Sequence, residues 1–199
     1  AAVAAGRYRL VHYNQYHYML SKDLGYEVIA MNEENGKATV AGSVVVRKDS
    51  GIDSIQDLRG RRILFGGGPQ AMQSYIYSSF LLKQGGLSEG DYEVEFTRDA
   101  QSALVDTYLQ LNNVSAVGIG DGELDMPVIA KQIDTTQLKV LSIGERLAHY
   151  PWAIKTDLST ELKIRIQQIL MQLDQTDRGK RVLQRAQLTH IVKAVDTDF

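Results

Sequence analysis

A strand that runs through three consecutive glycines toward a helix constrains this chain more than any other feature. Residues 62–66 are predicted to form the strand, residues 66–68 are all glycine, and Pro69 follows, a residue favoured in a helix's first turn. Backbone N–H groups at a helix start have no partner within the helix, and the helix dipole favours negative charge there. The pattern therefore predicts an anion site, although a loose turn between strand and helix remains an alternative. The residues predicted to contact the anion, the last three through their N–H groups, are Gly68, Gln70, Ala71 and Met72.

Composition excludes several classes of function. The chain has 199 residues, of which 44% are hydrophobic and 23% charged, with a formal net charge of -2 and no cysteine. This length can bury one domain or two small lobes. The near-neutral charge gives no electrostatic footprint for nucleic acid, and the lack of cysteine excludes disulfides and thiolate metal sites. The histidines lack metal-ligand spacing and are interpreted as structural or surface residues, so no metal or cofactor is predicted.

Known catalytic motifs are also missing from the sequence. It contains no Gly-x-Ser-x-Gly elbow, His-Glu-x-x-His motif or Walker loop, so we predict that the protein is not an enzyme. No apolar run approaches the length of a membrane span, and no signal peptide is visible. Residues 1–6 resemble the end of a helix closed by Gly6, and we therefore expect further chain upstream.

Hydrophobic periodicity predicts an alternation of strands and helices. The predicted strands are 8–12, 26–31, 37–47, 62–66, 92–97, 114–119 and 138–143. The predicted helices are 14–23, 69–84, 101–111, one opening at Asp121, one capped by Ser159 and one at 177–186. The helix after Ser159 carries a predicted core face of Leu162, Ile166, Ile169, Leu170 and Leu173. This order favours an α/β fold with mostly parallel sheets.

A cluster of aromatic and polar side chains follows the first predicted strand. Open α/β sheets bind ligands at the carboxyl ends of their strands, so we expect Tyr13 and Asn14 to be exposed in a cleft, with Tyr16 beside them. For Tyr18 we expect packing. The alternative for the whole cluster is a capped helix whose tyrosines pack on the first lobe.

Several motifs, in their order and spacing, resemble one family over nearly the whole chain. The residues that carry the resemblance are 6–14 (GRYRLVHYN), 46–51 (VRKDSG), 57–60 (DLRG), 116–121 (AVGIGD), 149–154 (HYPWAI), 187–189 (QLT) and 196–199 (DTDF). They are similar to the phosphate, phosphite and phosphonate binders among the periplasmic solute-binding proteins of ABC transporters, which have the type 2 periplasmic-binding-protein fold.

The resemblance implies two α/β lobes joined by crossing strands, with the ligand between them. Lobe one would comprise residues 1–46 and 143–199 and lack its N-terminal part, and lobe two would comprise residues 47–142. The implied function is the receptor of an ABC importer that binds a small oxyanion and delivers it to a membrane permease. The implied location is the periplasm, either free or as a lipoprotein anchored to the membrane.

The resemblance also bears on the site. Asp121 matches a position near an acidic group of the family's pockets, and Tyr150 stands where the family has a carboxylate. Family members carry Ser and Thr hydroxyls where this chain has residues 69–73 (PQAMQ). Asp121 is also a predicted helix N-cap. Two alternatives therefore stay open: a ligand-sensing domain of the same fold, or a degenerate homologue with another ligand.

Overall fold

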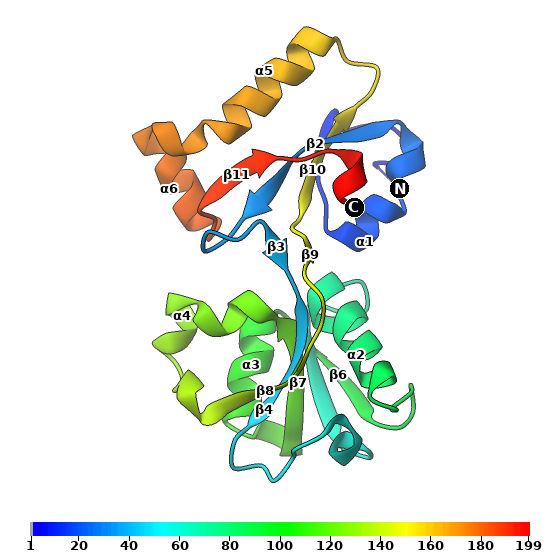
Figure 1. The fold of residues 1–199 in the computed structure, drawn as a ribbon, viewed down its shortest axis with the longest axis vertical. Helices are drawn as coiled ribbons and strands as arrows, with labels where there is room; N and C mark the ends of the chain where they lie inside the picture. Colours follow the sequence, from blue (N-terminus) through cyan, green and yellow to red (C-terminus); the bar gives the residue numbers. More distant parts are fainter. Residues whose placement is uncertain (1) are drawn as a thin grey trace. The chain divides into compact units, whose positions relative to one another are not determined.

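The computed structural model describes residues 2–199 and divides the chain into two units. The first unit comprises Ala1–Thr39 and Leu147–Phe199, and the second comprises Val40–Arg146. The chain thus passes from one unit to the other twice, and the short strands β3 (Thr39–Val40) and β9 (Leu147–Ala148) pair at these crossings (Figure 1). This division differs by a few residues from the predicted lobe boundaries, because strands β4 and β8 lie wholly in the second unit's sheet.

The first unit is built on an antiparallel sheet. In the described part of this unit the strand order is β1-β10-β2-β11, and each neighbouring pair is antiparallel. The strands are β1 (Leu10–His12), β2 (Tyr26–Glu33), β10 (Pro151–Lys155) and β11 (His190–Lys193). The helices are α1 (Gln15–Met19), α5 (Thr160–Met171) and α6 (Asp177–Arg185), with 3₁₀ turns at Lys22–Leu24, Leu173–Gln175 and Asp196–Asp198.

The second unit has a mixed sheet covered by helices on both faces. Its order within the described residues is β6-β5-β7-β4-β8, in which β5 is parallel to β6 and β7, and β4 is antiparallel to β7 and β8. The strands are β4 (Gly42–Arg47), β5 (Arg62–Gly66), β6 (Glu93–Thr97), β7 (Val114–Gly120) and β8 (Leu138–Ile143). The helices are a π-helix at Met72–Tyr77 that continues into α2 (Ser78–Gln84), α3 (Ala100–Tyr108) and α4 (Pro127–Ala130), with 3₁₀ turns at Ile55–Leu58, Leu111–Asn113, Asp121–Asp125 and Thr135–Gln137.

The α/β prediction is confirmed, but parallel pairing is confined to the second unit. The reason is the double crossing of the chain. The strand that leaves each unit's core and the strand that returns to it run in opposite directions and lie side by side: β2 with β10 in the first unit, β4 with β8 in the second (Figure 1). In the first unit β1 and β11 also flank these strands in antiparallel pairs.

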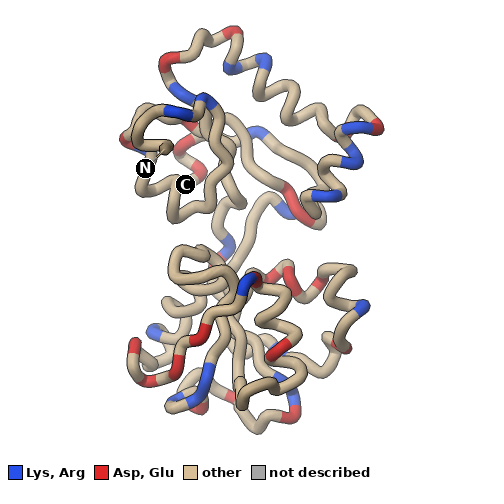
Figure 2. Tube along the Cα trace, turned by 180° about the vertical axis from the view of Figure 1, so that it is seen from behind, with Lys and Arg blue, Asp and Glu red and all other residues tan. Residues whose placement is uncertain are grey.

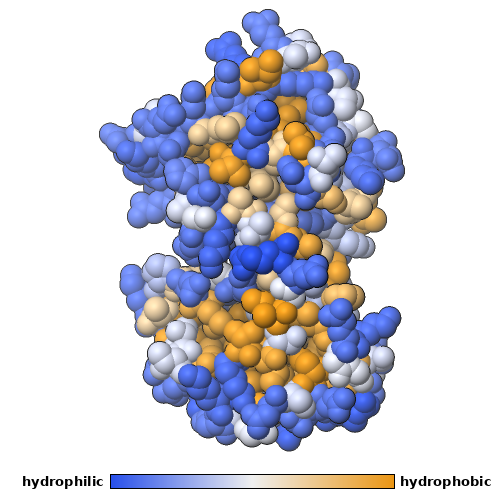
Figure 3. Space-filling view, viewed as in Figure 1, coloured by the Kyte–Doolittle hydropathy of each residue, from blue (hydrophilic) through white to orange (hydrophobic). Residues whose placement is uncertain are grey.

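Alternation along β4 builds the two cores of the second unit. Val44 packs on the α2 side with Leu81 and Leu82, and Val45 packs on the α3 side with Leu104. Successive strand residues point to opposite faces, so one strand serves both cores. Apolar side chains also gather on the face of this unit seen in Figure 3, and the edge strand β8 leaves Val140 and Ile143 exposed.

Helix α5 uses only part of its predicted apolar face. Ser159 caps it as predicted, because its side chain accepts a hydrogen bond from the Leu162 N–H. Ile166, Leu170 and Leu173 pack against the first unit's core. Leu162 and Ile169 are 42% and 56% exposed, because they lie on one flank of the stripe rather than at its centre.

Lysines, arginines and acidic residues are intermixed along both units, as Figure 2 shows.

Two shorter predictions are refined. The predicted strand 37–47 is interrupted at Ala41, which separates β3 from β4. Residues 2–6 form a turn in which Gly6 has a φ of 67°, as expected for a helix end, while Ala1 lies outside the described residues.

Candidate functional site

The glycine run of the second unit is shaped by close packing as well as by the turn. A Cβ on Gly66 would lie 2.1 Å from the Ala100 backbone nitrogen, so glycine is required where β5 ends against the start of α3. Gly67 and Gly68 adopt φ angles of 90° and 126°, which residues with a Cβ rarely adopt. The Gly67 N–H donates to the Thr97 carbonyl at 3.0 Å. The local structure therefore explains why glycine occupies each of these three positions.

The helix after the glycines begins later than predicted. It starts at Met72, with Ala71 as N-cap, and Pro69 lies in the preceding turn rather than in the helix's first turn. Its first segment is a π-helix, in which the Ala71 carbonyl accepts from the Tyr75 N–H at 2.9 Å and from the Ile76 N–H at 3.1 Å. Such wide turns within helices occur frequently at functional sites.

The predicted N–H donors of this loop are only partly available. The Ala71 N–H donates to the Gly68 carbonyl at 3.0 Å, so the expectation that it is a free donor is wrong: the turn consumes it. Among residues 2–199, the N–H groups of Gly68 and Met72 have no protein acceptor. Gln70 is exposed at the loop tip, and Met72 is half-buried. The loop therefore offers two backbone donors beside an exposed amide side chain.

Ser74 anchors this loop to the sheet through two hydrogen bonds. Its buried hydroxyl accepts from the Gly66 N–H at 2.6 Å and donates to the Gly118 carbonyl at 2.7 Å. The hydroxyl thereby joins the carboxyl end of β5 to β7 across the sheet. It is committed to the fold and is not a spare donor for a ligand.

Asp121 is tied to the segments through which the chain enters and leaves the second sheet. Its Oδ1 accepts from the Ala41 N–H at 2.9 Å, and its Oδ2 lies 2.5 Å from Arg146 Nη1. Gly120 is the N-cap of the following turn, so the prediction of Asp121 as N-cap is wrong. Asp121 occupies the first helical position instead, and its carboxylate is held by these two partners.

In the first unit, the tyrosine cluster divides into packed and half-buried members. The expectation that Tyr13 is exposed is wrong: the residue is 6% exposed, and its ring packs against Tyr18 and Tyr26. Tyr18 is buried, as predicted. Asn14 is the N-cap of α1, and its Oδ1 accepts from the His17 N–H at 2.8 Å. Tyr16 stays half-buried on α1.

A second aromatic cluster lies where β1 ends and β10 begins. His12 and Trp152 are cross-strand partners, and their rings stack with centroids 4.5 Å apart. The half-buried Tyr150 presents its ring edge to His12 at 5.9 Å. The Trp152 indole N–H donates to Asn32 Oδ1 at 2.9 Å, which fixes the indole against β2. His12 itself remains exposed, although one face of its ring is covered.

A buried histidine supports this cluster. His149 Nδ1 accepts from the Tyr150 N–H at 2.7 Å, so the proton resides on Nε2, which lies 3.3 Å from Glu34 Oε2. Although His12 is exposed on one side, desolvation of the ring lowers its pKa, the nearby His149 lowers the pKa further, and the hydrogen bond with the Asn32 side chain raises it. The net effect is a pKa of His12 below that of an unperturbed imidazole.

Sequence reasoning missed this cluster. His12 and His149 are among the histidines interpreted from the sequence as structural or surface residues. The usable signal was the position of His12 at a strand's carboxyl end. The register that pairs it with Trp152, 140 positions away, is a tertiary feature that spacing does not reveal.

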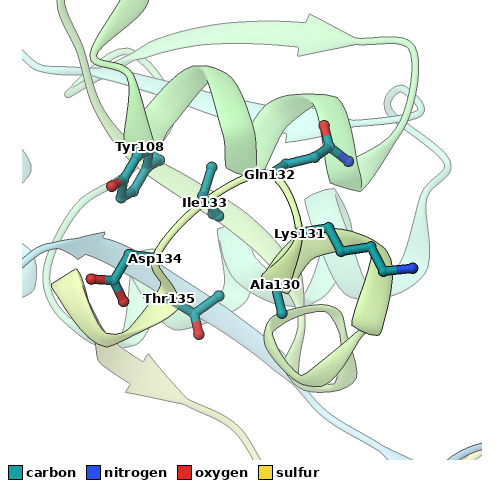
Figure 4. A pocket seen from close by; sticks show the side chains of 7 residues that line it. All are labelled: Tyr108, Ala130, Lys131, Gln132, Ile133, Asp134 and Thr135. Atoms are coloured by element: carbon teal, nitrogen blue, oxygen red, sulfur yellow. The ribbon is translucent and has the colours of Figure 1, made fainter.

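An open groove of about 480 Å³ lies elsewhere on the second unit. Its lining residues are Tyr108 and residues 130–135, which include none of the predicted ligand contacts. Figure 4 shows Lys131 extending away from Tyr108 and Asp134. The Asp134 carboxylate is occupied by the Thr136 N–H and hydroxyl at 3.0 and 2.6 Å. The groove is thus separate from the candidate site.

Metal-binding and membrane-spanning features were sought in residues 2–199. No three histidine or acidic side chains there are grouped as a metal ion would require. No helix in that range combines the length and apolar character needed to cross a membrane.

Comparison with known proteins gives one family. The sequence model described as "ABC transporter, phosphonate, periplasmic substrate-binding protein" matches residues 1–199, the full length of the chain.

Solved structures agree on the fold. A binding-protein component of an ABC phosphonate transporter from Pseudomonas aeruginosa has a TM-score of 0.78 at 16% identity, over 99% of this chain and 67% of that one. A Prochlorococcus marinus protein in complex with methylphosphonate has a TM-score of 0.74 at 15% identity, over 99% and 76%. A Xanthomonas citri protein bound to ATP has a TM-score of 0.76 at 16% identity, over the same shares. At these identities the matches establish the predicted two-lobed periplasmic-binding-protein fold.

Proposed function

Because the chain belongs to the phosphonate family of periplasmic substrate-binding proteins of ABC transporters, we propose that it binds a small oxyanion of the phosphonate, phosphite or phosphate type. The match of the family model over all 199 residues carries this proposal. The family comprises transport receptors and is not an enzyme class. It is periplasmic, and its members serve a membrane permease, which is the partner proposed here.

In the proposed mechanism, the ligand lies between the two units and contacts both. The second unit contributes the loop 66–72, where the N–H groups of Gly68 and Met72 have no acceptor within residues 2–199 and Gln70 is exposed. Backbone N–H groups in a glycine-rich turn before a helix suit an anion. Closure of the units around the ligand would present the surface that the permease recognises.

The first unit contributes side chains rather than backbone donors. Asn14, Tyr16 and Tyr150 lie at or near the carboxyl end of β1 and at the start of β10 and remain half-buried, so their polar groups can reach a ligand at that edge. Tyr13 and Asp121 are assigned supporting roles, because the first packs in the core and the second is held by Ala41 and Arg146.

The test is a thermal-shift titration against methylphosphonate, 2-aminoethylphosphonate, phosphite, phosphate and sulfate. A ligand that binds only the folded state stabilises it by about 2.7 kcal/mol at a hundredfold excess over its Kd. A dose-dependent rise in Tm with one phosphorus oxyanion and none with sulfate supports the proposal. No rise with any phosphorus oxyanion overturns it.

A matched pair of variants locates the site. Gln70→Glu places a negative charge at the tip of the candidate loop, and like-charge repulsion should weaken binding of an anion. Gln132→Glu makes the same change at an exposed glutamine of the separate groove. We expect the first variant to lose most of the ligand-induced rise in Tm and the second to retain it. Equal responses would remove the loop from the site.

A further inference from the structure

The inference concerns the first unit and rests on the proposed function. From the geometry of the cluster at the β1–β10 edge we infer that His12 contacts the bound oxyanion as an imidazolium, so that ligand binding is coupled to the uptake of one proton. Trp152 and Tyr150 position the ring.

The first argument is the fixed position of the imidazole. Its ring stacks on Trp152 at 4.5 Å, and the indole is itself held by the hydrogen bond to the buried Asn32. A side chain restrained in this way loses little conformational entropy when it engages a ligand. His12 nevertheless stays exposed, which leaves part of the ring available to a ligand.

The second argument is the arrangement of charge. The titratable groups around His12 are His149 and Tyr150 on the segment that enters β10, and Glu34 beyond His149. Glu34 is paired with His149 Nε2 at 3.3 Å and is not among the groups that shift the pKa of His12. His12 therefore has no adjacent carboxylate among the described residues, and a bound oxyanion would supply the missing counter-charge.

The third argument is the direction of the proton equilibrium. Desolvation of the ring and the nearby His149 hold the pKa of His12 below its usual value in the free protein. A negative charge within about 4–6 Å favours the protonated form. Binding would then raise the pKa, the protein would take up a proton, and affinity would fall as pH rises through neutrality. A ring that acted only as a neutral donor would show neither effect.

The Trp152 indole stacked on the His12 imidazole favours the protonated form of His12 over the neutral form. An imidazolium stacked on an aromatic face gains a cation–π attraction that neutral imidazole lacks. The same indole keeps water from one face of His12, which strengthens the interaction between the ring and an anion. Trp152 is thus a positioning residue for His12.

The experiment is isothermal titration calorimetry with methylphosphonate at pH 6.0, 7.0 and 8.0, in pairs of buffers of different ionisation enthalpy. The number of protons taken up is compared between the wild type and His12→Gln, which preserves hydrogen-bonding capacity but cannot titrate. Because the ligand's own ionisation is common to both proteins, the difference reports His12. His190→Gln replaces another part-exposed histidine of the first unit and is the matched control.

We expect His12→Gln to bind about ten- to a hundredfold more weakly at pH 6.0, as removal of a charged hydrogen bond predicts, and to take up fewer protons. His190→Gln should match the wild type. Binding by His12→Gln with wild-type affinity and proton uptake overturns this inference and leaves the proposed function standing. Lack of binding by the wild type to every phosphorus oxyanion overturns both.

A readout that needs no variant guards against a folding defect. The NMR titration of the His12 imidazole in the wild-type protein should show a pKa below the usual value, and an upward shift once methylphosphonate is added. An unchanged His12 titration in the presence of bound methylphosphonate overturns the inference without any variant.

Discussion

Arg146 Nη1 lies 2.5 Å from Asp121 Oδ2, and this pair joins the segment that leaves the second sheet to the end of β7. The other carboxylate oxygen, Oδ1, accepts from the Ala41 N–H on the segment that enters the same sheet. One side chain therefore holds both segments through which the chain crosses between the units. This explains why an aspartate at the end of a strand is needed even though it does not cap a helix.

Replacing Asp121 should loosen the entry to β4. Asp121→Ala removes both partners and leaves the Ala41 N–H without its acceptor, so we expect a loss of about 1–3 kcal/mol of unfolding free energy. Asp121→Asn retains an oxygen for Ala41 and loses only the ion pair, which costs less than about 1 kcal/mol because Arg146 is partly exposed to solvent. Hydrogen exchange at the Ala41 amide, followed by NMR, measures the effect.

The control is Asp125→Ala, which changes an exposed aspartate of the same 3₁₀ turn. Its Ala41 amide should exchange at the wild-type rate. If Asp121→Ala also leaves that rate unchanged, the carboxylate does not hold the segment.

The Ser74 hydroxyl gives a second prediction. Ser74→Ala leaves the buried Gly66 N–H and the Gly118 carbonyl without their shared partner, so we expect a loss of about 1–3 kcal/mol in urea unfolding. Ser142→Ala, on the edge strand β8, removes a hydroxyl that has no hydrogen-bond partner among residues 2–199 and should cost less than about 0.5 kcal/mol. Equal stabilities of the two variants would contradict this role for Ser74.

Tyr18 predicts how stability responds to alkaline pH. Its hydroxyl donates to Asp196 Oδ1 at 2.5 Å, and burial together with this carboxylate raises its pKa above the usual value of about 10. The folded state therefore keeps its proton where the unfolded state loses it. The stabilisation of the folded state by this difference in pKa is fully present below about pH 10 and declines as pH rises beyond that value.

The measurement is the free energy of unfolding between pH 8 and pH 11. The wild type should lose stability above about pH 10, and Tyr18→Phe should lose less over the same interval while being less stable at pH 8. Tyr16→Phe, on the same helix, is the control and should follow the wild type. A pH dependence that is identical in Tyr18→Phe and the wild type would exclude this assignment.

The sequence predicted the order of most strands and helices because their signals are local. Ser159 and Asn14 cap helices as expected, and the strand 62–66 ends at the glycines as expected. The antiparallel sheet of the first unit could not be predicted in this way. Its neighbours β2 and β10 are far apart in the chain, and only the double crossing places them together.

The candidate site was predicted less well for the same reason. Whether an N–H is free depends on the turn: the Ala71 donor is consumed by Gly68, whereas the Met72 donor is not. Whether a tyrosine is exposed depends on the residues packed against it, and Tyr13 is covered by Tyr18 and Tyr26. Neither fact can be inferred from residue type or spacing.

The last prediction concerns the glycine run, because alanine substitutions at Gly66 and Gly68 should have different effects. In Gly66→Ala, the new Cβ would lie 2.1 Å from the Ala100 nitrogen and 2.5 Å from the Asp99 carbonyl carbon, so β5 and the start of α3 must separate. We expect a loss of at least about 2 kcal/mol in unfolding free energy. A Cβ on Gly68 meets no atom within 4 Å, so Gly68→Ala pays only for its φ of 126°.

That backbone strain should change ligand binding more than stability. An alanine at position 68 would rotate the peptide away from its present φ, and the Gly68 N–H, which has no protein acceptor in the described chain, would point elsewhere. We therefore expect Gly68→Ala to fold with a loss of about 1–3 kcal/mol and to lose most of the Tm rise with methylphosphonate. A folded Gly68→Ala that binds methylphosphonate like the wild type would show that the Gly68 N–H does not contact the ligand, since binding would be insensitive to the direction of that N–H.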